Sequence, residues 1–187
     1  MTKFICETKN LSKKYKDFYA LKNVNLTIPK GEIYGLVGEN GAGKTTLIRL
    51  LTGLNFKSEG EIILFGHKDN LQHERSKIGC TIEMPALYKD MTASQNLEVQ
   101  RIQRGIPNKK CITDTLELIG LSNAGKKRVA NFSLGMKQRL ALGVALLGEP
   151  EFLILDEPVN GLDPTGIIEL RELLKKLVKE REVTILI

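Results

Sequence analysis

A glycine-rich segment of this sequence has the residue types and spacing of a phosphate-binding loop. Residues 38–45 read Gly-Glu-Asn-Gly-Ala-Gly-Lys-Thr, which matches the pattern GxxxxGK[ST]. Glycines let the backbone curl so that its N–H groups point at phosphate oxygens, and a helix start adds partial positive charge. Lys44 is predicted to reach the β- and γ-phosphates, and the Thr45 hydroxyl to bind Mg²⁺. The predicted nucleotide contacts come from Gly38, Glu39, Asn40, Gly41, Ala42, Gly43, Lys44, Thr45 and Thr46.

Two adjacent carboxylates follow a short apolar run later in the chain. Residues 152–155 read Phe-Leu-Ile-Leu, and Asp156, Glu157 and Pro158 come next. Because successive side chains of a strand alternate in direction, the two carboxylates should point to opposite sides. We expect Asp156 to hold Mg²⁺ through water and Glu157 to act as the general base toward an attacking water. Together with the phosphate loop, these acids predict hydrolysis of a nucleoside triphosphate.

The phosphate loop by itself is shared by small GTPases, nucleoside kinases and motor ATPases. A GTPase is disfavoured because the guanine-reading pattern Asn-Lys-x-Asp is absent, and residues 160–163 read Asn-Gly-Leu-Asp without the lysine. A nucleoside kinase is disfavoured because the sequence has no arginine-rich lid segment. The elements around the two motifs must therefore narrow the choice.

Those elements predict an α/β protein with two kinds of strand. Near-continuous apolar runs are typical of parallel strands that are covered on both faces, and helical patterns separate them. These runs occupy residues 33–37, 78–82, 152–155 and 183–187. Alternating segments favour antiparallel strands, with a turn near residues 13–18. These segments occupy residues 4–7, 24–28 and 61–66. Between residues 86 and 147 the sequence is mostly helical, with helix starts expected at Thr92 and Ser133.

Residues 131–139 read Asn-Phe-Ser-Leu-Gly-Met-Lys-Gln-Arg and open a predicted helix just before the acidic strand. At this point the sequence resembles the ATP-binding subunits of ABC transporters, whose signature LSGGQ has this place in the chain. The resemblance covers essentially all 187 residues. It implies that Ser133 and Gly135 bind the γ-phosphate of an ATP held by a partner subunit. It also implies that Tyr15 stacks on adenine and that Asp163 reaches the partner's phosphate site.

The resemblance implies a P-loop NTPase fold in a single domain over residues 1–187, with a parallel core sheet. The expected antiparallel β subdomain comprises residues 1–31 and 60–67. The expected core comprises residues 32–59, 77–83 and 149–187, and the helical subdomain with the signature comprises residues 86–148.

The sequence departs from the family's pattern at several positions. Glu83 stands where the family has a glutamine that touches Mg²⁺, and a carboxylate there could still help to bind the metal. Leu134 and Met136 replace a glycine and a glutamine of the signature, so Leu134 must point away from the nucleotide. With these departures the sequence resembles the bacitracin and lantibiotic export and immunity branch of the family.

The composition indicates in which cellular compartment the protein is expected and which partners it can have. The formal net charge is +6, and no apolar run approaches the ~20 residues that span a bilayer. The N-terminus has no features of a signal peptide, and three cysteines without a CxxC pair fit a reducing cytosol. The family's switch histidine would lie beyond Ile187, and His67 and His73 come too early. We therefore expect a truncated chain that binds Mg-ATP and hydrolyses it slowly.

The function that the resemblance implies is that of an ATPase subunit of an ABC exporter, for which its branch suggests antimicrobial peptides as cargo. It would pair with an identical or a related ATPase subunit, with ATP at the interface, and with an integral membrane subunit. It would lie on the cytoplasmic face of the membrane, and no nucleic acid is expected. Two alternatives stay open: a soluble ABC ATPase that acts on ribosomes or DNA, and a nucleotide-binding module that does not hydrolyse ATP. No residue of the sequence identifies the cargo.

Overall fold

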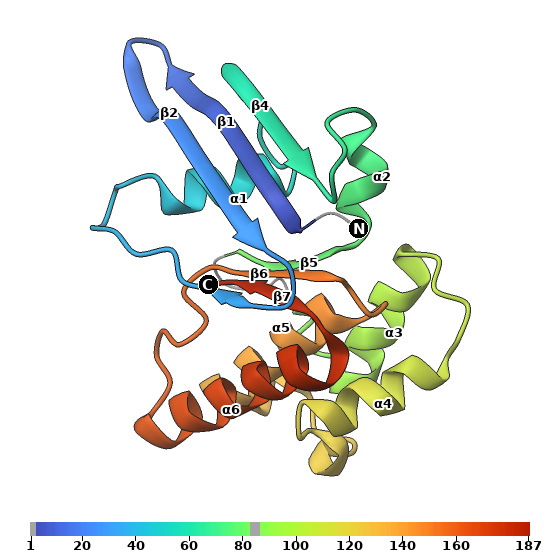
Figure 1. Cartoon of the computed structure of the whole chain (residues 1–187). Helices are drawn as coiled ribbons and strands as arrows, with labels where there is room; N and C mark the ends of the chain where they lie inside the picture. Colours follow the sequence, from blue (N-terminus) through green and yellow to red (C-terminus); the bar gives the residue numbers. More distant parts are fainter. Residues whose placement is uncertain (1–2, 83–86) are drawn as a thin grey trace.

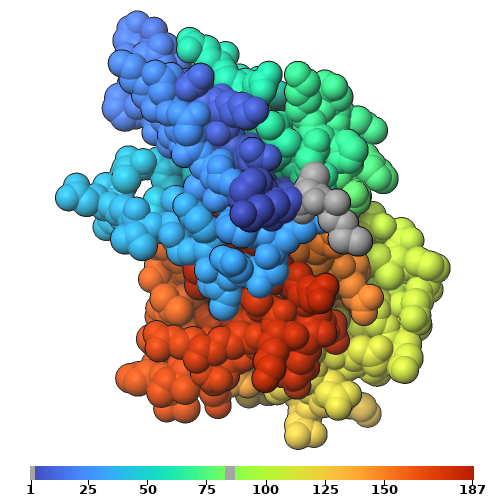
Figure 2. All heavy atoms as spheres, viewed as in Figure 1, coloured from blue at the N-terminus to red at the C-terminus, as the bar shows by residue number. Residues whose placement is uncertain are grey.

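The computed structural model of the chain describes residues 3–82 and 87–187. Within these ranges the chain forms a three-stranded sheet, a four-stranded sheet and a group of helices (Figure 1). The three-stranded sheet lies at one end of the molecule, and α6 (Pro164–Arg181) lies at the other end in the space-filling view (Figure 2). The four-stranded sheet lies between them (Figure 1).

The three-stranded sheet is antiparallel, as the alternating segments predict. It contains β1 (Phe4–Tyr15), β2 (Phe18–Pro29) and β4 (Glu59–Leu64), in the order β2-β1-β4. β1 and β2 run for 12 residues each and are longer than the sequence indicated. They continue past the apolar residues because each pairs with the other along its length, up to Tyr15 opposite Phe18.

The four-stranded sheet is parallel and has the order β3-β7-β6-β5. Its strands are β3 (Ile33–Tyr34), β5 (Ile78–Thr81), β6 (Phe152–Leu155) and β7 (Thr184–Leu186). β3 is shorter than the expected strand over residues 33–37. The Leu36 N–H nevertheless donates to the Ile187 carbonyl at 2.6 Å, so the extended chain continues briefly toward the phosphate loop.

The inner strand β6 is buried on both faces, which explains its unbroken apolar run. Phe152 and Ile154 belong to a core that they share with the antiparallel sheet and α1 (Lys44–Leu51). Leu153 and Leu155 belong to a second core, which they share with the helices on the other face. The two cores therefore hold the carboxyl end of β6, and with it Asp156 and Glu157, in a fixed place.

The helices of the second core are α3 (Ala93–Gln103), α4 (Lys110–Leu118), α5 (Leu134–Leu146) and α6. The helix start predicted at Thr92 is confirmed, and it forms a capping box, in which the Thr92 hydroxyl accepts from the Gln95 N–H and the Gln95 side chain accepts from the Thr92 N–H. Two short 3₁₀ turns, Ser122–Ala124 and Val129–Asn131, connect α4 to α5. A further short helix, α2 (Leu71–Arg75), follows β4 and was not expected from the sequence.

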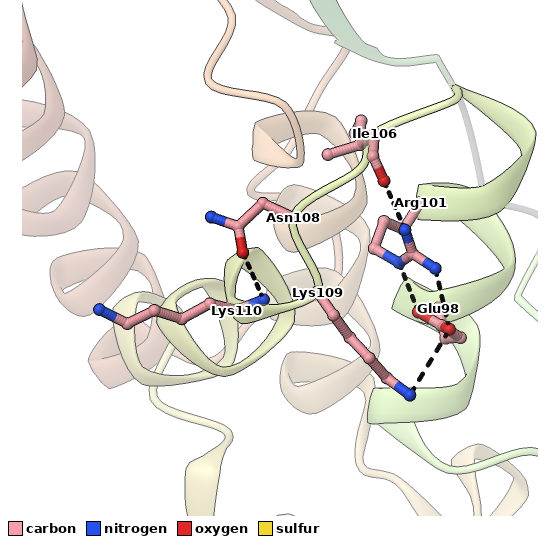
Figure 3. A network of polar contacts seen from close by, with 6 residues as sticks. All are labelled: Glu98, Arg101, Ile106, Asn108, Lys109 and Lys110. Atoms are coloured by element: carbon pink, nitrogen blue, oxygen red, sulfur yellow. Dashed lines mark hydrogen bonds and ion pairs between the residues drawn. The ribbon is translucent and has the colours of Figure 1, made fainter.

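Figure 3 shows the polar network that joins α3 to the start of α4. Glu98 accepts from Arg101 at 2.7 Å and lies 3.9 Å from the Lys109 ammonium, and Arg101 also donates to the Ile106 carbonyl. The hydrogen bond from Arg101 lowers the pKa of the Glu98 carboxyl. The connection between α3 and α4 is therefore held by charge-assisted bonds as well as by packing.

The buried cysteine Cys6 lies in β1 and belongs to the core that the antiparallel sheet shares with α1. Burial, with a contribution from the charge of Glu7, raises the pKa of its thiol to about 12. Among the described residues no helix has both the length and the apolar character to cross a membrane.

Candidate functional site

The phosphate loop connects β3 to α1 and projects from the edge of the molecule (Figure 1). Its lysine, Lys44, is the first residue of α1, and its ammonium turns back onto the loop. The Lys44 Nζ donates to the Gly38 carbonyl at 2.6 Å and to the Glu39 carbonyl at 2.9 Å. The Ala42 N–H also donates to the Glu39 carbonyl, at 3.1 Å. The loop is therefore curled around its own lysine.

Gly43 must be a glycine for two reasons. It caps α1 with φ +92°, a left-handed conformation that a side chain disfavours. A Cβ at this position would also lie 2.5 Å from the Ala20 carbonyl oxygen and 2.8 Å from Leu21. The close approach of β2 to the loop thus fixes where α1 begins, and it directs the free N–H groups of the first turn.

The phosphate loop meets the acidic strand through one hydrogen bond between side chains. The Thr45 Oγ1 donates to the Asp156 Oδ2 at 2.8 Å, across 111 residues of sequence. Asp156 is held in turn by its backbone, whose N–H donates to the Thr81 carbonyl at 2.9 Å. A hydroxyl and a carboxylate are the hard oxygen ligands that Mg²⁺ takes in addition to phosphate oxygens. The residues present therefore fit this metal.

A cavity of about 190 Å³ lies over the start of α1. It is lined by Asn40, Gly41, Gly43, Lys44, Thr45, Thr46 and Glu157. The structure thus brings the phosphate loop and Glu157 into one cavity, with Asp156 bonded to its wall. Glu157 has φ +49°, because the chain turns sharply directly after β6. Such backbone strain in a non-glycine residue is more common at functional sites than elsewhere.

The signature residues lie at a different place, against a separate cavity of about 880 Å³. Ser133 caps α5, and its hydroxyl accepts from the Met136 N–H at 3.2 Å. Asp163 caps α6 in the same way and accepts from the Gly166 N–H at 2.9 Å. Ser133, Gly135 and Asp163 line this second cavity together. They do not line the cavity of the phosphate loop.

Leu134, which replaces a signature glycine, packs against the loop that leads to α6. A Cβ on Gly161 would lie 2.5 Å from the Leu134 Cδ2. Gly161 also has φ +75°, a conformation that favours glycine. The side chain of Leu134 fills the space that the absent Cβ of Gly161 leaves. The branched side chain at residue 134 therefore packs partly on its own chain and keeps 39% of its surface exposed.

Tyr15, the residue expected to stack on adenine, lies apart from the phosphate cavity. Tyr15 ends β1 with 45% of its surface exposed. Its hydroxyl accepts from the Asn55 side chain, and the Lys13 ammonium lies 4.7 Å from its ring centre. Tyr15 is not among the residues that line the phosphate cavity. Glu83 lies outside the described residues.

Comparison with known proteins adds a family model described as ABC transporter, which matches residues 21–160. The bacitracin transport ATP-binding protein BcrA of Enterococcus faecalis is 45% identical over 186 residues, which cover 98% of this chain. The lantibiotic transport ATP-binding protein SrtF of Streptococcus pyogenes is 47% identical over 178 residues, which cover 95% of this chain and 76% of the relative. The chain spans 60% of the length of the bacitracin relative.

Solved structures agree with the sequence relatives. The cbiO1 protein of Clostridium perfringens, described as part of the ABC transporter complex cbiONQ, matches with a TM-score of 0.89 and 30% identity, covering 99% of this chain and 78% of the other. A dimeric ATP-binding cassette, MJ0796, bound to ADP and phosphate after hydrolysis, matches with a TM-score of 0.82 and 30% identity, covering 97% and 86%. The expected combination of a parallel core, an antiparallel sheet and helices is confirmed by these likenesses.

Proposed function

This chain belongs to the ABC transporter family of ATP-binding proteins, and from that premise we propose that it binds Mg-ATP and hydrolyses it. The observation that carries the proposal is the bond between Thr45 and Asp156, with Glu157 lining the same cavity as the phosphate loop. Phosphate binding, metal binding and water activation need these groups within a few ångströms of one another. The proposal is supported by the positions of these groups, which lie in the segments that follow β3 and β6.

In this proposal the phosphates of ATP occupy the cavity over the start of α1. The N–H groups of the first turn of α1 and the Lys44 ammonium face the phosphate oxygens. Lys44 then exchanges its bonds to the Gly38 and Glu39 carbonyls for charge-assisted bonds to phosphate. Thr45 and Asp156 would hold Mg²⁺, which neutralises charge that develops on the β- and γ-phosphates.

Glu157 serves as the general base of the proposed hydrolysis. Its carboxylate accepts a proton from a water that attacks the γ-phosphorus in line with the departing ADP. The turn after β6 directs Glu157 into the phosphate cavity while its neighbour Asp156 stays bonded to Thr45. The two carboxylates therefore do different work although they are adjacent in the sequence.

A second copy, or a related ATPase subunit, would complete each nucleotide site. Ser133, Gly135 and Asp163 lie together but away from the phosphate cavity of their own chain, which suits a role toward a partner's ATP. The dimer of the MJ0796 cassette, with ADP and phosphate bound, supports this arrangement by likeness. Closing and opening of the ATP-bound pair would then drive the partner in the membrane.

The proposed partner is an integral membrane subunit, and the proposed location of the protein is the cytoplasmic face of the membrane. The bacitracin and lantibiotic transport proteins among the relatives support export of antimicrobial peptides as the process that this ATPase drives. The rival proposal, action on ribosomes or DNA, gains no support from the relatives named above.

A pull-down of the full-length protein tests the partner. The Glu157→Gln variant, tagged and expressed in its own organism, is expected to recover an integral membrane protein in near-equal amount from solubilised membranes with Mg-ATP. The same experiment with Lys44→Ala provides the matched control, because its recovery should not respond to ATP. Recovery of ribosomes or DNA-bound proteins from the cytosol, with nothing from membranes, would overturn the transporter proposal.

A further inference from the structure

A chain of hydrogen bonds joins α5 to the carboxylate of Glu157. The Gln138 Nε2, on the second turn of α5, donates to the Asn160 carbonyl at 3.2 Å. The Asn160 side-chain amide donates to the Glu157 Oε2, and the Asn160 N–H donates to the Glu157 carbonyl at 3.1 Å. The sequence assigned no role to Gln138 or Asn160. Their contacts end on the group that is proposed to act as the base.

Apolar packing also connects α5 to the loop after β6, next to the hydrogen bonds. Leu134 fills the space at Gly161, where a Cβ would lie 2.5 Å from its Cδ2. One residue further along each segment, a Cβ on Gly135 would lie 3.6 Å from the Leu162 Cδ2, which is ordinary van der Waals contact. The loop of residues 159–163 therefore lies along the first two turns of α5, with the bond from Gln138 to Asn160 between them and with Leu134 and Leu162 each beside a glycine of the opposite segment.

We propose that Asn160 is a positioning residue for the Glu157 carboxylate and that Gln138 holds Asn160 in place. The inference rests on the proposed function, since it assumes that Glu157 is the base. A glutamate at the surface has several rotatable bonds, and Glu157 is exposed. The Asn160 amide occupies one carboxylate oxygen as a donor and leaves the other oxygen for a water. It therefore selects the rotamer in which the base is ready.

The connection has a consequence for the paired enzyme. Ser133, at the start of α5, is expected to meet the partner's nucleotide, and Gln138 lies on the second turn of the same helix. A displacement of α5 when the partner's nucleotide binds would move the Asn160 carbonyl and, through it, the Asn160 amide on Glu157. Occupancy of one site would thus adjust the base of the other.

Isosteric variants test the inference in the full-length protein. Asn160→Asp and Gln138→Glu each remove the amide donor while keeping the size of the side chain. A misplaced catalytic group can cost up to about 100-fold in rate. We expect kcat for ATP to fall about tenfold in Asn160→Asp and about threefold in Gln138→Glu, with KM unchanged within about twofold. The double variant should be little worse than Asn160→Asp alone, because the two residues act in one chain.

One control variant and four possible outcomes separate this inference from the proposed function. Gln103→Glu, at the exposed end of α3, makes the same substitution on another helix and should keep the wild-type kcat. Equal hydrolysis by wild type and Glu157→Gln would overturn the assignment of Glu157 as the base, and with it this inference, whereas a wild type that hydrolyses no ATP would overturn the proposed function. An inactive Glu157→Gln beside an Asn160→Asp with wild-type kcat would overturn the positioning role alone. The positioning role would also be overturned if KM in Asn160→Asp rose by the same factor by which kcat fell and the melting temperature fell as well. That pattern would indicate a general structural role.

A second measurement does not depend on turnover. Hydrogen exchange of the backbone amides of residues 160–162 should be faster in Asn160→Asp and Gln138→Glu than in wild type, because the loop loses its attachment to α5 or to Glu157. Unchanged exchange in both variants would mean that the contacts do not hold the loop, and it would overturn the inference whatever the ATPase rate.

Discussion

Replacing Glu157 with glutamine is expected to slow ATP hydrolysis by about 100-fold or more while ATP still binds. General-base catalysis contributes about 10² to 10⁴ in rate, and an amide cannot accept the proton of the attacking water. The substitution keeps the shape of a side chain that lines the phosphate cavity, so the contacts of the phosphate loop should persist. Measurement of kcat and of the dissociation constant for Mg-ATP on the same preparation checks both parts.

The Lys44→Ala variant should lose affinity for ATP, whereas Glu157→Gln should lose hydrolysis and keep its affinity. Hydrogen bonds that involve a charged group contribute about 1.5 to 3 kcal/mol each, so loss of the ammonium should weaken ATP binding by about 10- to 100-fold or more. Normal hydrolysis by Glu157→Gln would show that another group accepts the proton. Normal affinity in Lys44→Ala would show that the phosphates bind elsewhere.

Replacing Gly79 with alanine is expected to destabilise the fold by about 3 kcal/mol or more, the upper range for an overpacked core. Gly79 is buried in β5, and a Cβ there would lie 2.1 Å from the Ala145 carbonyl oxygen and 2.9 Å from the Pro150 Cγ. The nearest atom belongs to the backbone of α5, so a shift of a side chain cannot relieve the clash. For a chain of this size the melting temperature should fall by about 6 to 12 °C.

The Gly35→Ala variant is the matched control for this stability measurement. Gly35 is exposed, its added Cβ would have no neighbour within 4 Å, and its φ lies outside the left-handed range. Its melting temperature should stay within about 2 °C of wild type, since surface substitutions commonly change stability by about 0.5 kcal/mol or less. Equal melting temperatures for Gly79→Ala and wild type would contradict the close packing of α5 on β5.

The parts of the fold that the sequence predicted are those with local causes. The glycines of the phosphate loop, the capping box at Thr92 and the cap at Ser133 each act within a few residues, and the structure contains all three. The unbroken apolar run of β6 predicted a strand covered on both faces. In the structure each face of β6 meets a different core, so an apolar residue is needed at every position. Local signals were therefore sufficient to place the acids at a strand end.

Other features depended on contacts that no local pattern encodes. The helix α2 has five residues, too few to show a helical period. Gln138 contacts Asn160 across 22 residues, and only the path of the loop after β6 brings them together. The tolerance for Leu134 depends likewise on the glycine at residue 161. The roles expected for Tyr15, Ser133, Gly135 and Asp163 stay predictions, as does the metal-binding role of Glu83.

The bonds from Lys44 to the carbonyls of Gly38 and Glu39 bear on the kinetics of nucleotide association. A loop that is already curled has lost most of its conformational entropy before the ligand arrives, so less of the interaction energy is spent on ordering it. In the proposed reaction ATP would need only to replace two carbonyl acceptors by phosphate oxygens, and association would not have to wait for a disordered segment to fold. When ADP leaves, the same two carbonyls would take the ammonium back, and the empty loop would keep the shape that the next ATP requires.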